Sequence, residues 1–141
     1  MKKSPLKRKP SKLKRSPLRR KSKDPRKKAK DDADRALQDW YRAKYPKNRC
    51  EACGGQFEVM HHFIAKSQSN YLRYDDRNLI FLCQGCHYRH HNVGDQKIMS
   101  TVILKRGEKW HKEIIKESRK QIGPYTLGQY REIYFDYTER L

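Results

Sequence analysis

The segment CQGCHYRHHN, residues 83–92, places two cysteines and three histidines within a single short stretch of chain. A second pair of cysteines lies in CEACGG, residues 50–55, and a His-His pair follows in VMHHF, residues 59–63. One metal site in a protein takes about four ligands. The two segments hold more thiol and imidazole groups than one ion needs, so we expect two separate sites.

The cysteines follow the pattern Cys-x2-Cys, x29, Cys-x2-Cys, formed by Cys50, Cys53, Cys83 and Cys86. Four thiolates complete a tetrahedral Zn²⁺ without any histidine, so the pattern predicts a structural zinc site. Binding of this kind contributes on the order of 10 kcal/mol to the folding of small zinc modules. Two alternatives are a pair of disulfides and haem attachment, because residues 83–87 also match Cys-x-x-Cys-His.

The choice between zinc thiolates, disulfides and haem attachment depends on the cellular compartment of the protein. The chain has no run of eighteen apolar residues and no apolar signal segment near its N-terminus, so we expect neither a membrane span nor export. The predicted location is the cytoplasm. A reducing cytoplasm favours metal thiolates over disulfides.

Positive charge is concentrated in residues 1–30. The net charge is +19, and these residues contain sixteen of the 35 Lys and Arg residues but one acid, Asp24. SPLKRK at residues 4–9 recurs as SPLRRK at residues 16–21. With almost no apolar side chains, the segment is predicted to be a disordered arm. Such an arm binds polyanions by releasing counterions, so DNA is the expected partner; the alternatives are a localisation-like address and a solvating tail. The arm residues expected to contact DNA are Lys7, Arg8, Lys9, Arg19, Arg20 and Lys21.

Residues 31–141 are predicted to form one α+β domain, with a metal-binding core at 50–92 and a helical extension at 95–141. Asp31 or Asp32 is expected to cap a helix that ends near residues 45–46. Gly54 and Gly55 are available for positive φ in the first cysteine turn. The further expected elements are a strand over 56–63, a polar loop over 65–78, a strand over 79–83, a helix from about Cys86, and helices beginning at Asp95, near Trp110 and at Thr126.

Five of the six histidines, at positions 61, 62, 87, 90 and 91, flank the two cysteine pairs and remain once the thiols are assigned to zinc. On a strand His61 and His62 point to opposite faces, whereas on a helix His87 and His91 are four apart and share one side. One residue of the strand pair can therefore join His87 and His91 on a second cation, and its neighbour is free to act as a base. His90, about 100° around the helix from His91, is predicted to be a surface residue.

These residues resemble a known enzyme family. The histidine pair at 61 and 62, Asn78 directly before LIFLC, and His87 after the last cysteine resemble the His-Asn-His (HNH, or ββα-metal) endonuclease signature in its zinc-knuckle form, over residues 50–92. More narrowly, LRYDDRN at 72–78 and YTLGQYREIYFDYTERL at 125–141 resemble phage recombination endonucleases of the NinG (Rap) type. The resemblance implies a zinc-stapled ββα-metal core that hydrolyses phosphodiester bonds, in the cytoplasm of a bacterial host if the chain is encoded by a phage.

The resemblance also implies roles for individual residues. Neutral His62 takes a proton from the attacking water, and Asn78 organises the loop around it. A divalent cation, Mg²⁺ or Mn²⁺, is expected on His61, His87 and His91, beside the scissile phosphate; imidazole ligands also suit Zn²⁺, Ni²⁺ or Co²⁺. The loop residues Lys66, Arg73 and Arg77 are expected to hold phosphates, unless they only make the loop soluble.

Two other function classes fit part of the sequence. A non-catalytic zinc module that binds nucleic acid accounts for the arm and the cysteines, and an RNA-associated structural protein accounts for the charge. Neither explains the histidines or Asn78. Branched recombination or replication intermediates are candidate substrates, and cutting them would favour a homodimer formed through the amphipathic C-terminal helix.

Overall fold

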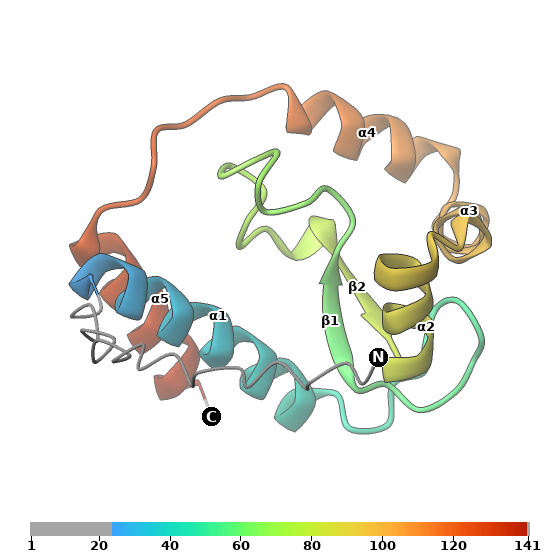
Figure 1. The fold of residues 1–141 in the computed structure, drawn as a ribbon, viewed down its shortest axis with the longest axis horizontal. Helices are drawn as coiled ribbons and strands as arrows, with labels where there is room; N and C mark the ends of the chain where they lie inside the picture. The colour runs from blue at the N-terminus through green and yellow to red at the C-terminus, as the bar shows by residue number, and fades with distance from the viewer. Residues whose placement is uncertain (1–23, 141) are drawn as a thin grey trace, which may run out of the picture.

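The computed structural model describes residues 24–140, which form helices on both sides of a two-stranded sheet (Figure 1). The elements in chain order are α1 (Pro25–Lys44), β1 (Val59–His62), the 3-10 turn η1 (Asp76–Asn78), β2 (Leu79–Leu82), α2 (Gln84–Tyr88), the π-helical turn η2 (Arg89–Val93), α3 (Gln96–Arg106), α4 (Glu108–Ser118) and α5 (Leu127–Glu139). The predicted mixed class is confirmed, with helix predominating over strand.

Helix α1 begins earlier than the sequence suggested. The Asp24 side chain accepts a hydrogen bond from the Arg26 backbone N–H at 3.0 Å, and Pro25 occupies the first helical position, where its missing N–H costs nothing. This Asp-Pro start replaces the predicted cap at Asp31 or Asp32, so residues 25–30 belong to the helix rather than to the arm. The rest of the arm, with its six predicted DNA contacts, lies outside the described residues.

The sheet divides the interior into two cores. Strands β1 and β2 are antiparallel, with Met60 opposite Phe81 and His61 opposite Ile80. Met60, Phe81 and Leu79 pack with α1 and α5, whereas Ile80 and Leu82 pack with Cys50, Cys86 and α3. Both strands are shorter than predicted. β2 stops at Leu82 because the Cys83 side chain caps α2 by accepting from the Cys86 N–H at 3.3 Å.

Helix α3 is tied to the sheet by Glu51 and Arg106. The Arg106 guanidinium donates to the Glu51 carboxylate and, at 2.7 Å, to the Leu79 carbonyl oxygen. Glu51 in turn accepts from the Phe81 backbone N–H at 2.9 Å. The cysteine-bearing turn, β2 and α3 are therefore fixed to one another by an ion pair that also bonds to the backbone.

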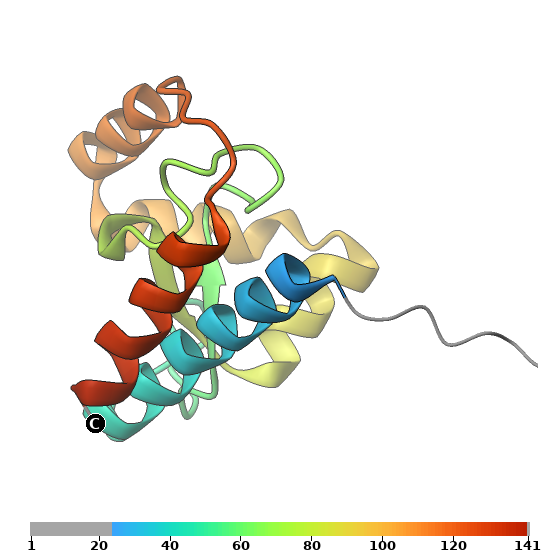
Figure 2. The ribbon, with the colours of Figure 1, turned by 90° about the vertical axis from the view of Figure 1, so that its left-hand side faces the viewer.

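The helical extension follows the predicted signals closely. Asp95 caps α3, and Thr126 with Gln129 forms the predicted capping box of α5. Helix α4, predicted to extend to about Ile122, ends at Ser118. Extended chain then leads to α5, which lies alongside α1 (Figures 1 and 2), with the Tyr137 and Trp40 ring centroids 5.7 Å apart. Among the described residues, no helix is long and apolar enough to cross a membrane.

Candidate active site and metal centre

The four cysteine thiols converge at one point beside α2. The Sγ atoms of Cys50, Cys53, Cys83 and Cys86 all lie within 4.8 Å of one another, and those of Cys53 and Cys83 are 3.7 Å apart. A Zn–S bond of about 2.3 Å in a tetrahedron requires S···S separations of about 3.8 Å. The donor set and its spacing therefore fit a zinc ion, and the cysteine cluster predicted from the sequence is present.

The first cysteine turn closes through backbone bonds. The Cys50 N–H donates to the Gly55 carbonyl oxygen at 2.7 Å, and the Gly54 N–H donates to the Cys50 carbonyl oxygen at 2.8 Å. Gly54 adopts φ 76°, as expected, because a side chain there would be strained. Gly55 does not take positive φ; a Cβ at that position would instead lie 3.3 Å from the Cys53 sulfur.

Backbone and arginine donors surround the sulfur atoms. The Gly55 N–H donates to Cys53 Sγ at 3.4 Å, and Arg89 Nη2 donates to Cys86 Sγ at 3.3 Å. The Gly55 N–H lowers the pKa of Cys53 to about 7, whereas burial raises the pKa of Cys86 to about 12. A metal ion bound here would deprotonate all four thiols despite these different acidities.

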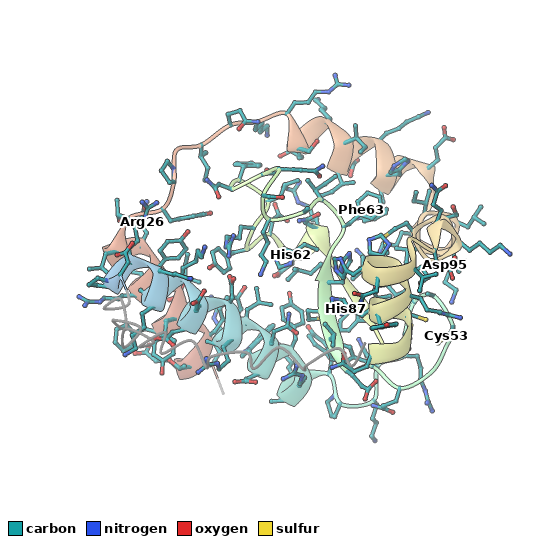
Figure 3. All side chains as sticks on the ribbon, viewed as in Figure 1. Arg26, Cys53, His62, Phe63, His87 and Asp95 are labelled. Atoms are coloured by element: carbon teal, nitrogen blue, oxygen red, sulfur yellow. The ribbon has the colours of Figure 1, made fainter. Side chains whose placement is uncertain are left out.

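A second cluster consists of imidazoles from β1 and from α2 with η2. One ring nitrogen from each of His61, His87 and His91 lies within 4.8 Å of the other two. His61 is 7% exposed and faces α2, and Figure 3 shows His87 between β1 and α2. Burial, followed by the neighbouring imidazoles, lowers the pKa of His61 to about 3. The ring is therefore neutral at physiological pH, which is the form that binds metal.

His90 does not lie where the sequence placed it. The helix widens into the π-turn η2 at Arg89, and this turn changes the angle between successive side chains. As a result the His90 and His91 rings both lie 4.9 Å from the His61 ring, centroid to centroid. His90 is more buried than the prediction of a surface residue suggested, and His91 is exposed, although His91 rather than His90 belongs to the group with metal-ligand spacing.

His62 points to the opposite side of β1, toward α1 and the loop of residues 65–78 (Figure 3). Its Nε2 lies 2.7 Å from the backbone carbonyl oxygen of Arg73. Because a carbonyl oxygen only accepts, Nε2 must carry the proton, and Nδ1 of the neutral ring keeps a free lone pair. Burial lowers the pKa of His62 below its ordinary value of 6.5, although the Arg73 carbonyl opposes this shift.

Asn78 ties this loop to the end of β1. The side chain is fully buried. Its Oδ1 accepts from the Ile64 N–H at 2.7 Å, and its Nδ2 donates to the carbonyl oxygens of Ile64 at 3.0 Å and Leu72 at 3.1 Å. One amide thus fixes the chain just after His62 and the chain just before Arg73, which carries the carbonyl that holds the His62 ring.

All five clustered histidines border one cleft of about 740 Å³. The cleft is also lined by Gln38, Lys66 and the chain that follows β1. Potential ligands from one face of the strand and a potential base from the other therefore open onto the same space.

The three loop cations occupy different environments. Lys66 lines the cleft, and 42% of its side chain is exposed. Arg73 is 6% exposed, and its guanidinium is bonded to Asp34, so it cannot reach a phosphate without breaking this ion pair. Arg77 is bonded through Nε and Nη2 to Asp75 and lies outside the cleft lining. Lys66 Nζ also bonds to Asp34, at 3.0 Å, but of the three cations it is the one that lines the cleft with His62.

Residues of α1 contribute to the site in a way that the sequence did not indicate. Asp34 binds Arg73, and the Gln38 amide makes two bonds to the backbone of Met60. The two positions are four apart on one helical face, but polar residues there are typical of any solvated face. No sequence feature near Asp34 identifies Arg73, which is 39 residues away, as its partner.

The family model described as HNH endonuclease matches residues 50–93. This segment contains both cysteine pairs, His61, His62, Asn78 and the histidines of α2 and η2. The match confirms the predicted resemblance to HNH endonucleases over this segment and supports a nuclease, a hydrolase that acts on nucleic acid. Neither the curated proteins nor the solved structures provide a match to the chain.

Proposed function

We propose that the protein is a metal-dependent DNA endonuclease that hydrolyses phosphodiester bonds with His62 as general base. The observation that carries the proposal is the bond from His62 Nε2 to the Arg73 carbonyl beside the imidazole cluster. His62, whose Nδ1 keeps a free lone pair, and a set of three candidate metal ligands then border one cleft. A purely structural metal module does not require a base held in one tautomer.

The chain's own residues perform the proton transfer. His62 Nδ1 accepts a proton from the attacking water, while its Nε2–H bond to Arg73 keeps the ring oriented and stabilises the positive charge that the ring acquires. A correctly placed general base contributes roughly 10²- to 10⁴-fold in rate. Asn78 acts on geometry by holding the loop that carries the Arg73 carbonyl.

His61, His87 and His91 would hold the catalytic cation. Their neutral nitrogens fit Mn²⁺, Zn²⁺, Ni²⁺ or Co²⁺, and Mg²⁺ if water completes its coordination. When bound, the cation supplies positive charge beside the scissile phosphate and the departing oxygen. Cys50, Cys53, Cys83 and Cys86 would hold a separate structural Zn²⁺.

The substrate is proposed to be DNA in the cytoplasm of a phage-infected bacterium, including branched recombination or replication intermediates. The residues that support DNA contact are the basic arm and Lys66 at the cleft. A homodimer with two centres would suit a branched substrate. One face of α5 packs on α1, while Phe135, 56% exposed, remains available for such an interface. Cleavage of labelled duplex, single-strand, flap and four-way substrates at fixed salt tests this choice.

The rival is a zinc-binding protein that binds nucleic acid without cutting it. Plasmid cleavage with Mg²⁺ or Mn²⁺, and its loss in EDTA, separates the two. His62→Ala should retain zinc, fold and DNA binding but lose cleavage by at least about 100-fold. His111→Ala is the matched control, because His111 is the histidine outside the cleft lining. If His62→Ala cuts as fast as wild type, the catalytic assignment is wrong.

A further inference from the structure

The loop carbonyl that orients His62 is itself held by helix α1, which precedes the segment matched by the HNH family model. Asp34 lies in the middle of α1, and 20% of its side chain is exposed. Its Oδ1 accepts from Arg73 Nε at 3.2 Å and from the Tyr74 hydroxyl at 2.9 Å. Its Oδ2 accepts from Arg73 Nη2 at 2.5 Å and from Lys66 Nζ at 3.0 Å.

These bonds leave the Arg73 side chain little freedom. The side chain is 7% exposed, so its guanidinium cannot exchange Asp34 for water without opening the core. Burial alone would raise the pKa of Asp34, but the charges of Lys66 and Arg73 hold that pKa below its ordinary value of 3.8. The carboxylate is therefore ionised at neutral pH, and its bonds to Arg73 are charge-assisted and strong.

The same face of α1 also fixes the strand that carries His62. One turn after Asp34, the Gln38 Nε2 donates to the Met60 carbonyl oxygen at 2.7 Å, and its Oε1 accepts from the Met60 N–H at 2.9 Å. The helix thus holds both partners of the His62 hydrogen bond: the strand through Gln38 and the loop through Asp34.

We propose that Asp34 is a positioning residue for the general base, acting through the Arg73 backbone to hold the His62 ring in its Nε2–H tautomer with Nδ1 facing the cleft. The role of Asp34 in catalysis rests on the proposed function, in which His62 is the base. The effect of Asp34 on the orientation of the His62 ring does not depend on that function. Lys66 shares the carboxylate, so the residue that orients the base also places a phosphate-binding cation beside it.

The test compares Asp34→Ala with Asp39→Ala in the full chain loaded with zinc. Asp39 lies on the same helix, pairs with Arg42 at 3.3 Å and is 52% exposed, so its removal deletes the same charge without touching the loop. The ¹⁵N resonances of the His62 ring at neutral pH report the tautomer directly. Cleavage of a labelled duplex gives kcat and KM separately.

Wild type and Asp39→Ala are expected to show one protonated nitrogen, Nε2, with a slowly exchanging proton. Asp34→Ala should lose that slow exchange and show averaged tautomers. Its kcat should fall roughly 10- to 100-fold, the cost typical of misplacing a reacting group by about 1 Å, with KM changed less. A folded Asp34→Ala protein that keeps the wild-type His62 signals overturns the proposal, even if its melting temperature falls.

Asp34→Ala leaves the Arg73 charge buried without its partner and can prevent folding. Asp34→Ala with Arg73→Met removes both charges but keeps the backbone carbonyl, and it should show the same loss of slow exchange. Retention of the tautomer in this double variant also overturns the proposal. If wild-type protein has the expected tautomer but does not cut DNA with any divalent ion, the proposed function fails while the positioning by Asp34 stands.

Discussion

Replacing Asn78 with alanine should destabilise the protein by about 3 kcal/mol. The side chain is fully buried and makes three hydrogen bonds to backbone groups of Ile64 and Leu72. The Leu72 carbonyl oxygen also accepts from the Asp75 N–H at 3.4 Å, so losing the Asn78 bond there costs about 0.5–1.5 kcal/mol. The two bonds at Ile64 are partly buried, and their loss costs about 0.5–1.5 kcal/mol each, because water can replace the amide.

Urea unfolding of the zinc-loaded protein, followed by circular dichroism, measures this loss. With a slope of about 2 kcal/mol per molar, a change of about 3 kcal/mol moves the midpoint down by about 1.5 M. Asn92→Ala is the matched control. Asn92 is exposed and makes one bond to the Tyr88 carbonyl oxygen, so its midpoint should stay within about 0.3 M of wild type.

In Asn78→Ala, the loop of residues 65–78 should lose its structure before the sheet unfolds. Because Asn78 bonds to the chain on either side of the Arg73 segment, its loss frees the carbonyl that orients His62, and cleavage should fall even at temperatures where the variant is folded. A midpoint shift as small as that of Asn92→Ala would refute the assignment of Asn78 as the residue that joins loop to strand. Wild-type cleavage by the folded variant would refute its link to His62.

Three further outcomes are expected. Cys50→Ser, or chelation of the zinc-loaded protein, should abolish cooperative unfolding, as followed by circular dichroism and zinc release, because the four thiols at zinc spacing join the turn of residues 50–55 to the start of α2. Burial, and then the bond to Asp76, raises the pKa of Tyr41. As pH rises above about 10, the hydroxyl ionises in the unfolded chain before it does so in the folded protein, so the free energy of unfolding falls. Tyr41→Phe should reduce the slope of that fall by up to about 1.4 kcal/mol per pH unit, measured by urea unfolding at several pH values. Removing residues 1–23, with twelve Lys and Arg residues, should reduce the slope of log K against log salt in filter binding, and an unchanged slope would exclude the arm from DNA contact.

The parts of the fold that the sequence predicted well depend on local signals. The cap at Asp95 and the capping box at Thr126 are contacts between residues two or three apart, so a short window of sequence contains all the information they need. The start of α1 was missed although its signal is also local. The Asp24-Pro25 pair was masked by the surrounding positive charge, which indicated an arm rather than a helix start.

In the candidate site, too, the features set by local sequence were predicted, and the features set by irregular helix geometry or by distant residues were not. Ligand type and strand alternation predicted the separation of His61 from His62, because side chains alternate along any strand. The position of His90 could not be predicted, since a π-turn has no reliable sequence pattern. The burial of Arg73 could not be predicted either, because its partner Asp34 is distant in sequence and the polar loop offered no reason to expect a buried cation.

The two faces of the sheet differ in how far the segment matched by the HNH family model supports them by itself. The face that carries His61 is closed by α2 and by the thiol cluster, both within residues 50–93, so the candidate metal ligands are fixed by that segment itself. The face that carries His62 is supported within that segment by the Asn78 side chain, and its remaining support comes from outside the segment. Its loop contains only the 3-10 turn η1, and it is fixed to α1 by Asp34 and by the Tyr41–Asp76 bond of 2.6 Å. Variants of α1 should therefore alter the orientation of the base while leaving the zinc content of the protein unchanged, whereas variants of the cysteines should alter both.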